Sequence, residues 1–390
     1  MRILIVTARY APHVGGLETV VREVAAQLRQ EGHTISLVTN RFPRTLPKYE
    51  EIENIPVRRL FFLVPKLSYL RSGHLVEWLA GLAFLPLTLI QLLRILLTYR
   101  PDVVNLHYLG SPAFFLLVLH YLLHFRLVVS LHGGDVDGEP YQSRFNRWLF
   151  EALLDRATKV TACSQVLLDH ALGLAPRILP KSSVIHNGVN TQLFESAKIY
   201  DHTRPYLFAV GQLSQHKGFD TLITAFAHIS KDVQELDLLI AGDGPERRRL
   251  SEQVLSYDLS QRVHLLGSIS REEVASLMRG CFAVVIPSRR EPFGIVGLEA
   301  MASGRPIIAT RIGGLTEALA DADVRWISID NQLSDLTIAL LTLMDTYGLQ
   351  EDVISVDNQE KSRRYSWQRV ASHYLEVFLE ATEARYIRDN

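Results

Sequence analysis

The stretch CFAVVIPSRREPFGIVGLEAMASGRPIIAT (281–310) decides the fold, because it holds a strand, a helix and a second strand in direct succession. The apolar run 281–287 has the length of a buried strand, and 306–310 is a second run of the same kind. Between them, small and aliphatic residues after a Pro-Phe-Gly turn predict a helix. This order is typical of a parallel α/β sheet.

The same alternation continues in both directions along the chain. The strands expected in a first sheet are 2–7, 34–39, 102–107, 126–132, 159–164 and 182–188, and those of a second are 206–211, 237–242, 262–267, 282–287 and 306–310. A polar stretch, 190–205, separates the two series. We therefore predict two Rossmann-like halves joined near residue 195, with a ligand in the cleft at the carboxyl ends of the strands.

Bulk composition is that of a globular protein. The 390 residues suffice for two domains, and hydrophobic and charged residues make up 47 % and 21 % of the chain. Residues 1–190 carry about six excess positive charges and the remainder about seven negative ones. Because the basic residues are scattered among aliphatic ones without an aromatic–basic stripe, we expect no nucleic-acid partner. Cys163 and Cys281 lie in apolar surroundings and predict buried free thiols in a reducing compartment.

Residues 75–97 form the most apolar segment, and 78–93 carry no charge. The uncharged run is shorter than a membrane span needs, and Pro86 and Arg94 interrupt it. We therefore expect a helix buried on the first sheet. Basic residues over 41–71 leave two interpretations open: peripheral docking of 41–97 on a membrane, or a solvated basic face beside a core helix.

Glu291 and Glu299 lie eight positions apart on either side of the helix start, too far apart to share a proton. The backbone amides of Gly294, Ile295 and Val296 would form the first helical turn and favour an anion such as a diphosphate. Two acids that flank such a turn predict an elongated ligand, anionic in the middle and hydroxylated at its ends. The alternative is two unrelated surface glutamates.

Three further features lie at predicted strand ends of the second half. Lys217 precedes a helix start and is placed to meet phosphate, or else is a solvent lysine in a loop. Gly242 and Gly244 follow a strand, but Arg247 stands where a dinucleotide fingerprint needs its third glycine. A tight strand–helix turn accounts for the two glycines equally well.

The first half offers a matching set. Gly15 and Gly16 precede a long amphipathic helix, where glycine lets backbone approach a ligand. His132 ends a strand and could bind a substrate hydroxyl, or simply cap a glycine turn. Asp135 and Asp137 form an Asp-Val-Asp pattern known from metal-dependent sugar transferases of a different architecture, so we expect no metal.

Together these segments resemble the family-four retaining glycosyltransferases of the GT-B fold, the glycosyl transferases group 1. The resemblance covers most of the chain, through 12–18, 100–107, 131–135, 184–190, 209–226, 240–246 and the E-x7-E element 291–310. It implies two Rossmann-like domains with parallel sheets facing across a cleft. The acceptor-side domain would span 1–195 and the donor domain 196–369, with 370–390 returning as a helix to the first domain.

The resemblance also implies residue roles. Lys217 would contact the donor diphosphate, Glu299 the ribose, and Glu291 with the amides of Phe293–Val296 the donor sugar and phosphates. Gly16 and His132 would come from the N-terminal domain, the histidine facing the transferred sugar. His132, Lys217 and Glu291 are thus the expected catalytic residues, and Gly15, Gly242 and Gly244 complete the expected donor-binding set.

One position departs from the family. An arginine commonly stands beside the lysine on the phosphates, and here it is Gln212. Either Lys217 and the helix amides suffice, or Arg289 or Arg290 substitutes, or activity is low.

The implied activity is transfer of a sugar from a nucleotide-diphosphate sugar to a glycan or lipid-linked acceptor, with retention and without a cofactor. We expect a cytoplasmic enzyme of cell-surface polysaccharide or glycolipid assembly, peripheral on the inner face of the membrane if 41–97 docks there. A non-catalytic sugar-nucleotide-binding protein and a sugar-nucleotide epimerase remain alternatives. A nicotinamide oxidoreductase is disfavoured, because the strand 34–39 is followed by Asn40 instead of an acid.

Overall fold

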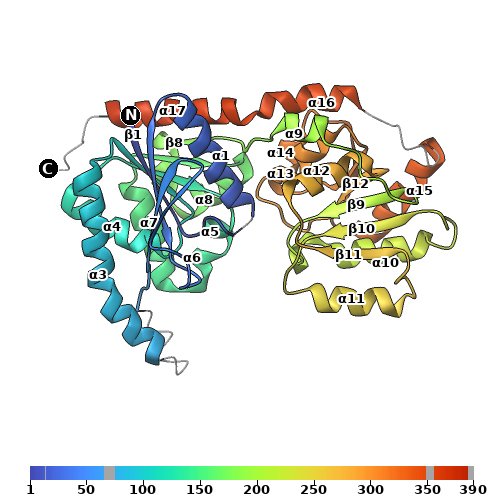
Figure 1. The fold of residues 1–390 in the computed structure, drawn as a ribbon, viewed down its shortest axis with the longest axis horizontal. Coiled ribbons are helices and arrows are strands. Elements are labelled where there is room, and N and C mark those ends of the chain that lie inside the picture. The colour runs from blue at the N-terminus through green and yellow to red at the C-terminus, as the bar shows by residue number, and fades with distance from the viewer. Residues whose placement is uncertain (14, 66–74, 348–354, 385–390) are drawn as a thin grey trace. The chain divides into compact units, whose positions relative to one another are not determined.

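The computed structural model describes residues 1–13, 15–65, 75–347 and 355–384. The chain divides into unit 1, Met1–His186 with Trp367–Asn390, and unit 2, Asn187–Ser366 (Figure 1). The boundary between the two units therefore lies after His186, about nine residues before the position expected at 195. The reason is that the short helix α9 (Thr191–Ser196) packs on helices α12 and α13 of unit 2.

Unit 1 is built on an eight-stranded sheet of order β3-β4-β2-β1-β5-β6-β7-β8. Its strands are β1 Arg2–Thr7, β2 Thr34–Asn40, β3 Tyr49–Ile52, β4 Ile55–Leu60, β5 Val103–His107, β6 Leu127–Leu131, β7 Lys159–Ala162 and β8 Ser182–Val184. The central strands β1, β2, β5 and β6 are buried along almost their whole length because helices cover both faces, and all neighbouring pairs except β3–β4 are parallel. Ile5 of β1, for example, pairs with Leu37 and Asn105.

The edge hairpin β3–β4 was not predicted. Glu53 and Asn54 both adopt positive φ angles, 51° and 61°, at the turn between its strands. Two successive positive values are the geometry of a tight antiparallel hairpin turn. The sequence YEEI of β3 is mostly polar, and a proline and two arginines interrupt the apolar residues of β4. Neither strand therefore has the continuous apolar run by which the other strands were predicted.

Unit 2 contains a six-stranded parallel sheet of order β11-β10-β9-β12-β13-β14. Its strands are β9 Tyr206–Val210, β10 Asp237–Ala241, β11 Val263–Gly267, β12 Ala283–Ile286, β13 Ile307–Thr310 and β14 Val324–Ile327, the last not expected. From β9 the chain adds β10 and β11 on one side of the sheet, and from β12 it adds β13 and β14 on the other side. The strand order therefore reverses between the neighbouring strands β9 and β12, and their carboxyl ends form a topological switch point.

Helices cover the sheets of both units. Those of unit 1 are α1 Gly16–Gln30, α3 Leu75–Tyr99, α4 Pro112–Leu123, α5 Gly134–Asp137, α6 Glu139–Gln142, α7 Arg144–Arg156, α8 Gln165–Leu174, η1 Pro176–Lys181 and α17 Trp367–Glu383. Those of unit 2, besides α9, are η2 Gln215–Lys217, α10 Phe219–Ile229, α11 Arg247–Ser256, α12 Arg271–Gly280, α13 Ile295–Ser303, α14 Gly313–Ala318, α15 Gln332–Tyr347, α16 Val356–Ser362 and η3 Arg363–Tyr365.

Helix α17 belongs to unit 1 although it comes last in sequence. It packs along α1 and buries Tyr374 and Phe378. The Nζ atom of Lys159 lies 2.5 Å from the carboxylate of Glu380, and Arg126 donates to the carbonyl of Thr382. The predicted α/β fold with two Rossmann-like domains and a returning C-terminal helix is thus confirmed.

Helix α3 corrects the expectation for 75–97. Pro86 and Arg94 do not interrupt it, and the helix runs unbroken over 25 residues. Only 22 % of its most apolar window, which lies within Trp78–Tyr99, is buried, so the helix is not buried on the sheet along most of its length. Length and composition alone would allow it to cross a membrane, a test that helices of soluble proteins also pass. Figure 1 shows its N-terminal half extending away from the rest of unit 1.

Candidate functional site

Unit 2 joins Lys217 to Glu291 at the carboxyl edge of its sheet. The loop after β9 turns through η2, which ends at Lys217, and Glu291 lies in the loop after β12. Nζ of Lys217 lies 2.5 Å from Oε2 of Glu291, and the two side chains are 18 % and 9 % exposed. Because β9 and β12 flank the switch point, this ion pair occupies the position where open α/β sheets bind ligands.

One side-chain and one backbone hydrogen bond hold the Glu291 loop in place. Ser288 donates its hydroxyl to Oε2 of Glu291 at 3.3 Å, and the amide of Gly314 donates to the Glu291 carbonyl at 3.0 Å. A Cβ at Gly314 would lie 2.0 Å from the carbonyl oxygen of Pro292. Gly314 was not singled out from the sequence, although the glycine pair at 313–314 directly after a strand is a recognisable signal of close backbone approach.

The start of α13 presents backbone amides next to this pair. Gly294 precedes the helix with φ of 88°, and no side chain among the described residues caps it. The amides of Ile295 and Val296 therefore lie in an uncapped first turn, which carries the positive end of the helix dipole. Phe293 is only 1 % exposed, so its side chain anchors the loop in the core and only its backbone could meet a ligand.

Glu299 lies one turn further along α13. Nη2 of Arg271, at the start of α12, approaches its Oε1 to 3.3 Å. Burial raises the pKa of the Glu299 carboxyl, and the positive charge of Arg271 acts in the opposite direction. A hydroxylated ligand would thus meet a carboxylate that already has one cationic neighbour, a contact that sequence analysis did not foresee.

In the loop after β9, Gln212 stands where the family commonly has an arginine. Its side chain is exposed. Arg289 does not replace the missing charge, because its guanidinium is bound by Asp220, by Thr221 at 2.7 Å and by the carbonyl of Gln215 at 2.8 Å. These contacts hold Arg289 at the start of α10. Lys217 contacts Glu291 directly, and the expected substitution by Arg290 stays a prediction.

Gly242 and Gly244 pack against the same loop. A Cβ at Gly242 would lie 1.9 Å from the carbonyl of Gly211, and one at Gly244 would lie 2.4 Å from the carbonyl of Leu213. The need for close contact between two backbone segments accounts for both glycines. Their predicted contact with a donor stays a prediction.

His132 lies in unit 1, directly after β6, and pairs with His107 at the end of β5. Nδ1 of His107 lies 2.9 Å from Nε2 of His132, and the two rings stack at 5.1 Å. Burial lowers the pKa of His132 to about 4 and that of His107 well below its ordinary value, so both rings are neutral at physiological pH. His107 ends a predicted strand as His132 does, and this shared position could have marked it.

Asp135 holds the turn after His132. Its Oδ1 accepts hydrogen bonds from the amides of His132 at 3.0 Å and Gly133 at 2.7 Å. Burial raises the pKa of this carboxyl to about 6, although these hydrogen bonds oppose the shift. Asp137 instead contacts His170, with 2.9 Å between its Oδ1 and Nδ1 of the ring. The two aspartates therefore have separate structural partners.

Gly15 and Gly16 mark the beginning of α1. Gly15 is extended, with φ of −178°, and no side chain among the described residues caps the helix. Residue 14 lies outside the described residues. The geometry leaves the amides of the first turn uncapped, as at α13.

Three side chains of unit 2 have the spacing of metal ligands, namely His202, Asp237 and His264. They lie at the amino ends of β10 and β11, at the sheet edge opposite Lys217. Oδ1 of Asp237 is 3.6 Å from Arg204 and 3.5 Å from Arg262. Two guanidinium groups on the same carboxylate disfavour a divalent cation there.

Comparisons with known proteins identify the family and the fold. Residues 192–357 match the family described as glycosyl transferases group 1, and residues 14–193 match glycosyltransferase family 4. An uncharacterized glycosyltransferase of Methanocaldococcus jannaschii is 27 % identical over 96 % of this chain and 97 % of its own. A glycogen synthase of Mycobacterium tuberculosis is 26 % identical, with 98 % and 95 % covered. The crystal structure of Anabaena HepE in complex with UDP-glucose superimposes with a TM-score of 0.75 at 20 % identity, covering 97 % of this chain and 99 % of that one.

Two Rossmann-like domains, the second with a lysine–glutamate pair beside an uncapped helix start, define a glycosyltransferase of the GT-B fold. The chain belongs to the family-four glycosyltransferases of this fold and is a hexosyltransferase.

Proposed function

We propose that the protein transfers a hexose from a nucleoside diphosphate sugar to a hydroxyl of a glycan or lipid-linked acceptor, with retention at the anomeric carbon. The observation that carries the proposal is the ion pair of Lys217 and Glu291 beside the uncapped start of α13. A cation and several amides at one point favour a diphosphate, while the carboxylate favours the hydroxyls of the attached sugar.

The leaving diphosphate requires charge neutralisation. Lys217 and the amides of Ile295 and Val296 are fixed before the donor arrives, so they stabilise charge without reorganising during the reaction. Nζ of Lys217 can keep Glu291 as one partner and turn a second N–H to a phosphate oxygen, since an ammonium group has three donors. Glu299 would accept hydrogen bonds from the ribose hydroxyls.

The reaction itself balances without a metal or cofactor. The acceptor oxygen forms a bond to the anomeric carbon on the face from which the diphosphate leaves. The bond between the anomeric carbon and the phosphate oxygen breaks, and its electron pair stays with the diphosphate. The proton of the acceptor hydroxyl passes to a leaving phosphate oxygen.

His132 would act as a neutral hydrogen-bond donor to the transferred sugar. Nε2 of His107 is buried and has no hydrogen-bond partner among the described residues. A buried acceptor without a partner is less unusual than a buried N–H without one, so Nε2 of His107 is assigned as the unprotonated nitrogen. The proton of His107 then lies on Nδ1, which donates to Nε2 of His132. His132 then carries its own proton on Nδ1 and can donate it to a hydroxyl oxygen.

The acceptor is presented at a membrane in this proposal. Exposed apolar side chains on α3 support it, among them Val76, Leu79, Leu82, Leu87 and Ile90. Such side chains partition into the interfacial region of a bilayer, and the basic residues at 41–48 would attract anionic lipid. The enzyme would then work at the inner face of the cell membrane, on a lipid-linked or growing surface glycan.

The first experiment identifies the donor and the stereochemistry. Thermal shift against UDP-, GDP- and ADP-sugars selects the nucleotide, and NMR of the product gives the anomeric configuration. Lys217→Ala and Glu299→Ala should each abolish transfer while the protein stays folded, and Lys231→Ala, at an exposed lysine of unit 2, should not. An inverted linkage would refute retention, and near-normal rates in either site variant would refute the role proposed for that residue.

A second experiment addresses the membrane. Sedimentation with phosphatidylglycerol vesicles should capture the protein, and the double variant Leu79→Glu/Leu82→Glu should reduce capture at least tenfold. Leu255→Glu, at an exposed leucine of unit 2, is the matched control. Equal capture of both variants would exclude α3 as the docking surface.

A further inference from the structure

Two loops of unit 2 lie side by side at the carboxyl edge of its sheet. One leads from β9 to α10 and carries Lys217, and the other leads from β12 to α13 and carries Glu291. The loops also meet through their backbones, because the amide of Arg289 donates to the carbonyl of His216 at 2.7 Å. The ion pair therefore joins two segments that are in contact on their own account.

Gly218 shows how closely the two loops approach. Its φ is 70°, and a Cβ at this position would lie 1.9 Å from the carbonyl oxygen of Pro287. Nε2 of Gln332 donates to the same carbonyl at 2.6 Å, which holds that backbone from the other side. A side chain at position 218 would push the loops apart, so glycine is needed there.

The side chain of Arg289 connects its own loop to the loop of Lys217 and to α10. Nη1 donates to the carbonyl of Gln215 at 2.8 Å. Nη2 donates to Oδ2 of Asp220 at 3.0 Å and to Oγ1 of Thr221 at 2.7 Å. A guanidinium group can bind three acceptors at once because its N–H groups have a fixed planar arrangement. Arg289 therefore holds residues on both sides of Lys217 in the sequence.

Asp220 keeps the far end of this side chain in place. Burial raises the pKa of the Asp220 carboxyl, but the hydrogen bond and charge of Arg289 and the charge of Arg249 outweigh it, and the pKa is lowered below its usual value. The carboxylate is therefore ionised at neutral pH. Arg249 reaches it from α11 at 3.4 Å, and its other contact among the described residues is with Glu246. Of the two arginines on this carboxylate, Arg289 is the one that contacts the loops.

The short helix η2 has few other connections. The first half of its loop is joined to the end of β10 and the following loop, through the amides of Gly211 and Leu213. Among the described residues, the hydrogen bonds from η2 to other segments involve Arg289 and Glu291. The place of Lys217 thus depends on these two residues.

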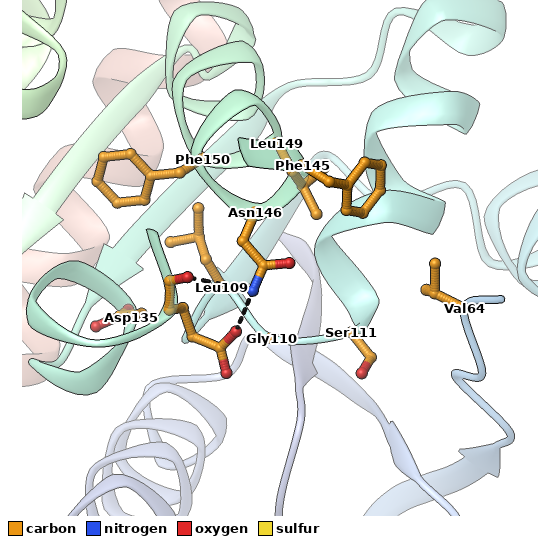
Figure 2. Close-up of a pocket in the computed structure, with 10 residues that line it drawn as sticks. Val64, Leu109, Gly110, Ser111, Asp135, Phe145, Asn146, Leu149 and Phe150 are labelled. Carbon is orange, nitrogen blue, oxygen red and sulfur yellow. Dashed lines mark hydrogen bonds between the residues drawn. The ribbon is translucent and has the colours of Figure 1, made fainter. Parts of the chain in front are cut away.

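Unit 1 holds a loop by a simpler contact of the same kind, shown in Figure 2. Nδ2 of Asn146, in the first turn of α7, donates to the backbone carbonyl and to Oε2 of Glu139, both at 3.1 Å. Both acceptors belong to one residue there. Arg289 instead binds three residues, so its loss would release more of the loop.

We propose that Arg289 is a positioning residue for sugar transfer, which keeps Lys217 in register with Glu291 and does not itself bind the diphosphate. This inference rests on the proposed function, which supplies the ligand of the ion pair. Without the guanidinium group, η2 would move more freely, and the ammonium group would meet the diphosphate less often in the productive geometry.

The first test needs no ligand. Hydrogen exchange followed by mass spectrometry reports the protection of residues 211–219 in the free protein. Arg289→Met keeps an unbranched side chain without donors, so exchange there should be at least tenfold faster. Arg249→Met removes the other arginine from Asp220, and as the matched control it should leave this exchange unchanged. Unchanged exchange in Arg289→Met, or equal acceleration in both variants, would overturn the proposal.

Nucleotide binding separates positioning from direct contact with phosphate. Asp220→Asn and Thr221→Val loosen the far end of Arg289 and leave its charge in place. Calorimetry with the nucleoside diphosphate that the wild type prefers should show Kd raised about fivefold to tenfold in both variants. An arginine that itself bound phosphate would be freed by these changes, so unchanged or tighter binding would refute the positioning role.

A double variant gives an independent measure. Lys217→Ala leaves no ammonium group to position, so adding Arg289→Met should not raise the Kd for the nucleoside diphosphate further. Losses that add would contradict the proposal. In transfer assays, Arg289→Met should lower kcat/KM for the donor about tenfold to a hundredfold. Arg289→Lys, which retains the charge and some of the donors, should recover part of this loss.

The outcomes separate this inference from the proposed function. If the wild type binds no nucleoside diphosphate, the proposed function fails, and hydrogen exchange still decides whether Arg289 holds the loop. If the wild type binds and transfers while the Arg289 variants match it, only the positioning role fails.

Discussion

Lys217 and Glu291 are 74 residues apart in the sequence, yet their side chains meet with 2.5 Å between Nζ and Oε2. The pair also receives the hydroxyl of Ser288. The cation that we propose binds the diphosphate is therefore held in a mostly buried ion pair. Its energetics and its function can therefore be measured separately.

Removing both partners should cost less than the sum of the two single removals. Lys217→Met or Glu291→Gln leaves an unmatched group in a mostly buried place, and we expect each to lower the free energy of unfolding by about 2–4 kcal/mol. The double variant should recover about 1–3 kcal/mol relative to the sum of the singles. Urea unfolding of the four proteins gives the coupling, and additive losses would show that the pair is not coupled.

Asp135 should make stability depend on pH. Burial raises its pKa from 3.8 to about 6, so between these values the native state holds a proton that the unfolded state has lost. The free energy of unfolding therefore falls as the pH rises through this window, by about 3 kcal/mol for this group. Asp135→Asn should lack this contribution.

Urea unfolding at pH 4.5 and pH 7, compared between wild type and Asp135→Asn, measures the difference. The lowered pKa values of His107 and His132 act with the opposite sign, because the native state then binds fewer protons than the unfolded state. Both histidines are present in both proteins and largely cancel in the comparison. An equal pH response of the two proteins would contradict the assignment.

His107 should act as a positioning residue for His132. His107→Phe keeps a stacked ring and removes the Nδ1 donor that holds the His132 tautomer. We expect kcat to fall about tenfold to a hundredfold with little change in the KM for the donor, because the donor's nucleotide is bound elsewhere. His107→Asn, which retains a donor, should recover part of the rate. A change in donor KM alone would argue against this role.

Gln212→Arg should tighten nucleotide binding. The side chain is exposed in the loop that carries Lys217, and Arg289 is held by its contacts with α10. An added cation near a diphosphate should lower the Kd for the nucleoside diphosphate about tenfold. Calorimetry measures it, with Gln215→Arg on the same loop as the control. Unchanged or weaker binding would count against a phosphate site at this loop.

The position of Lys217 and Glu291 at one edge of the sheet of unit 2 was predictable because the signals for it are local. Lys217 and Glu291 each stand between an apolar strand and a helix start, and in a parallel sheet such positions meet at one edge. The partners of the site were not predictable in this way. Arg271 reaches Glu299 from helix α12, and Gly314 reaches Pro292 from the start of helix α14, so both contacts depend on how separate elements pack.

The fold shows the same limit. Continuous apolar runs identified the buried strands, but β3 is mostly polar and the apolar residues of β4 are interrupted by Pro56 and two arginines, so neither strand forms such a run. For α3, the helix itself was predicted correctly, but its predicted burial on the first sheet was wrong. Its composition matched a core helix, and only the three-dimensional structure shows that few residues of its most apolar window are buried.

Because α17 is the last helix of the chain but belongs to unit 1, the unit that is synthesised first cannot be completed first. Unit 2 is one uninterrupted segment, whereas unit 1 lacks its last helix until everything in unit 2 has been made. On the ribosome, the side of the first domain that receives Tyr374 and Phe378 stays uncovered while the second domain can already close. The domain that the chain begins first is therefore the last one to be completed.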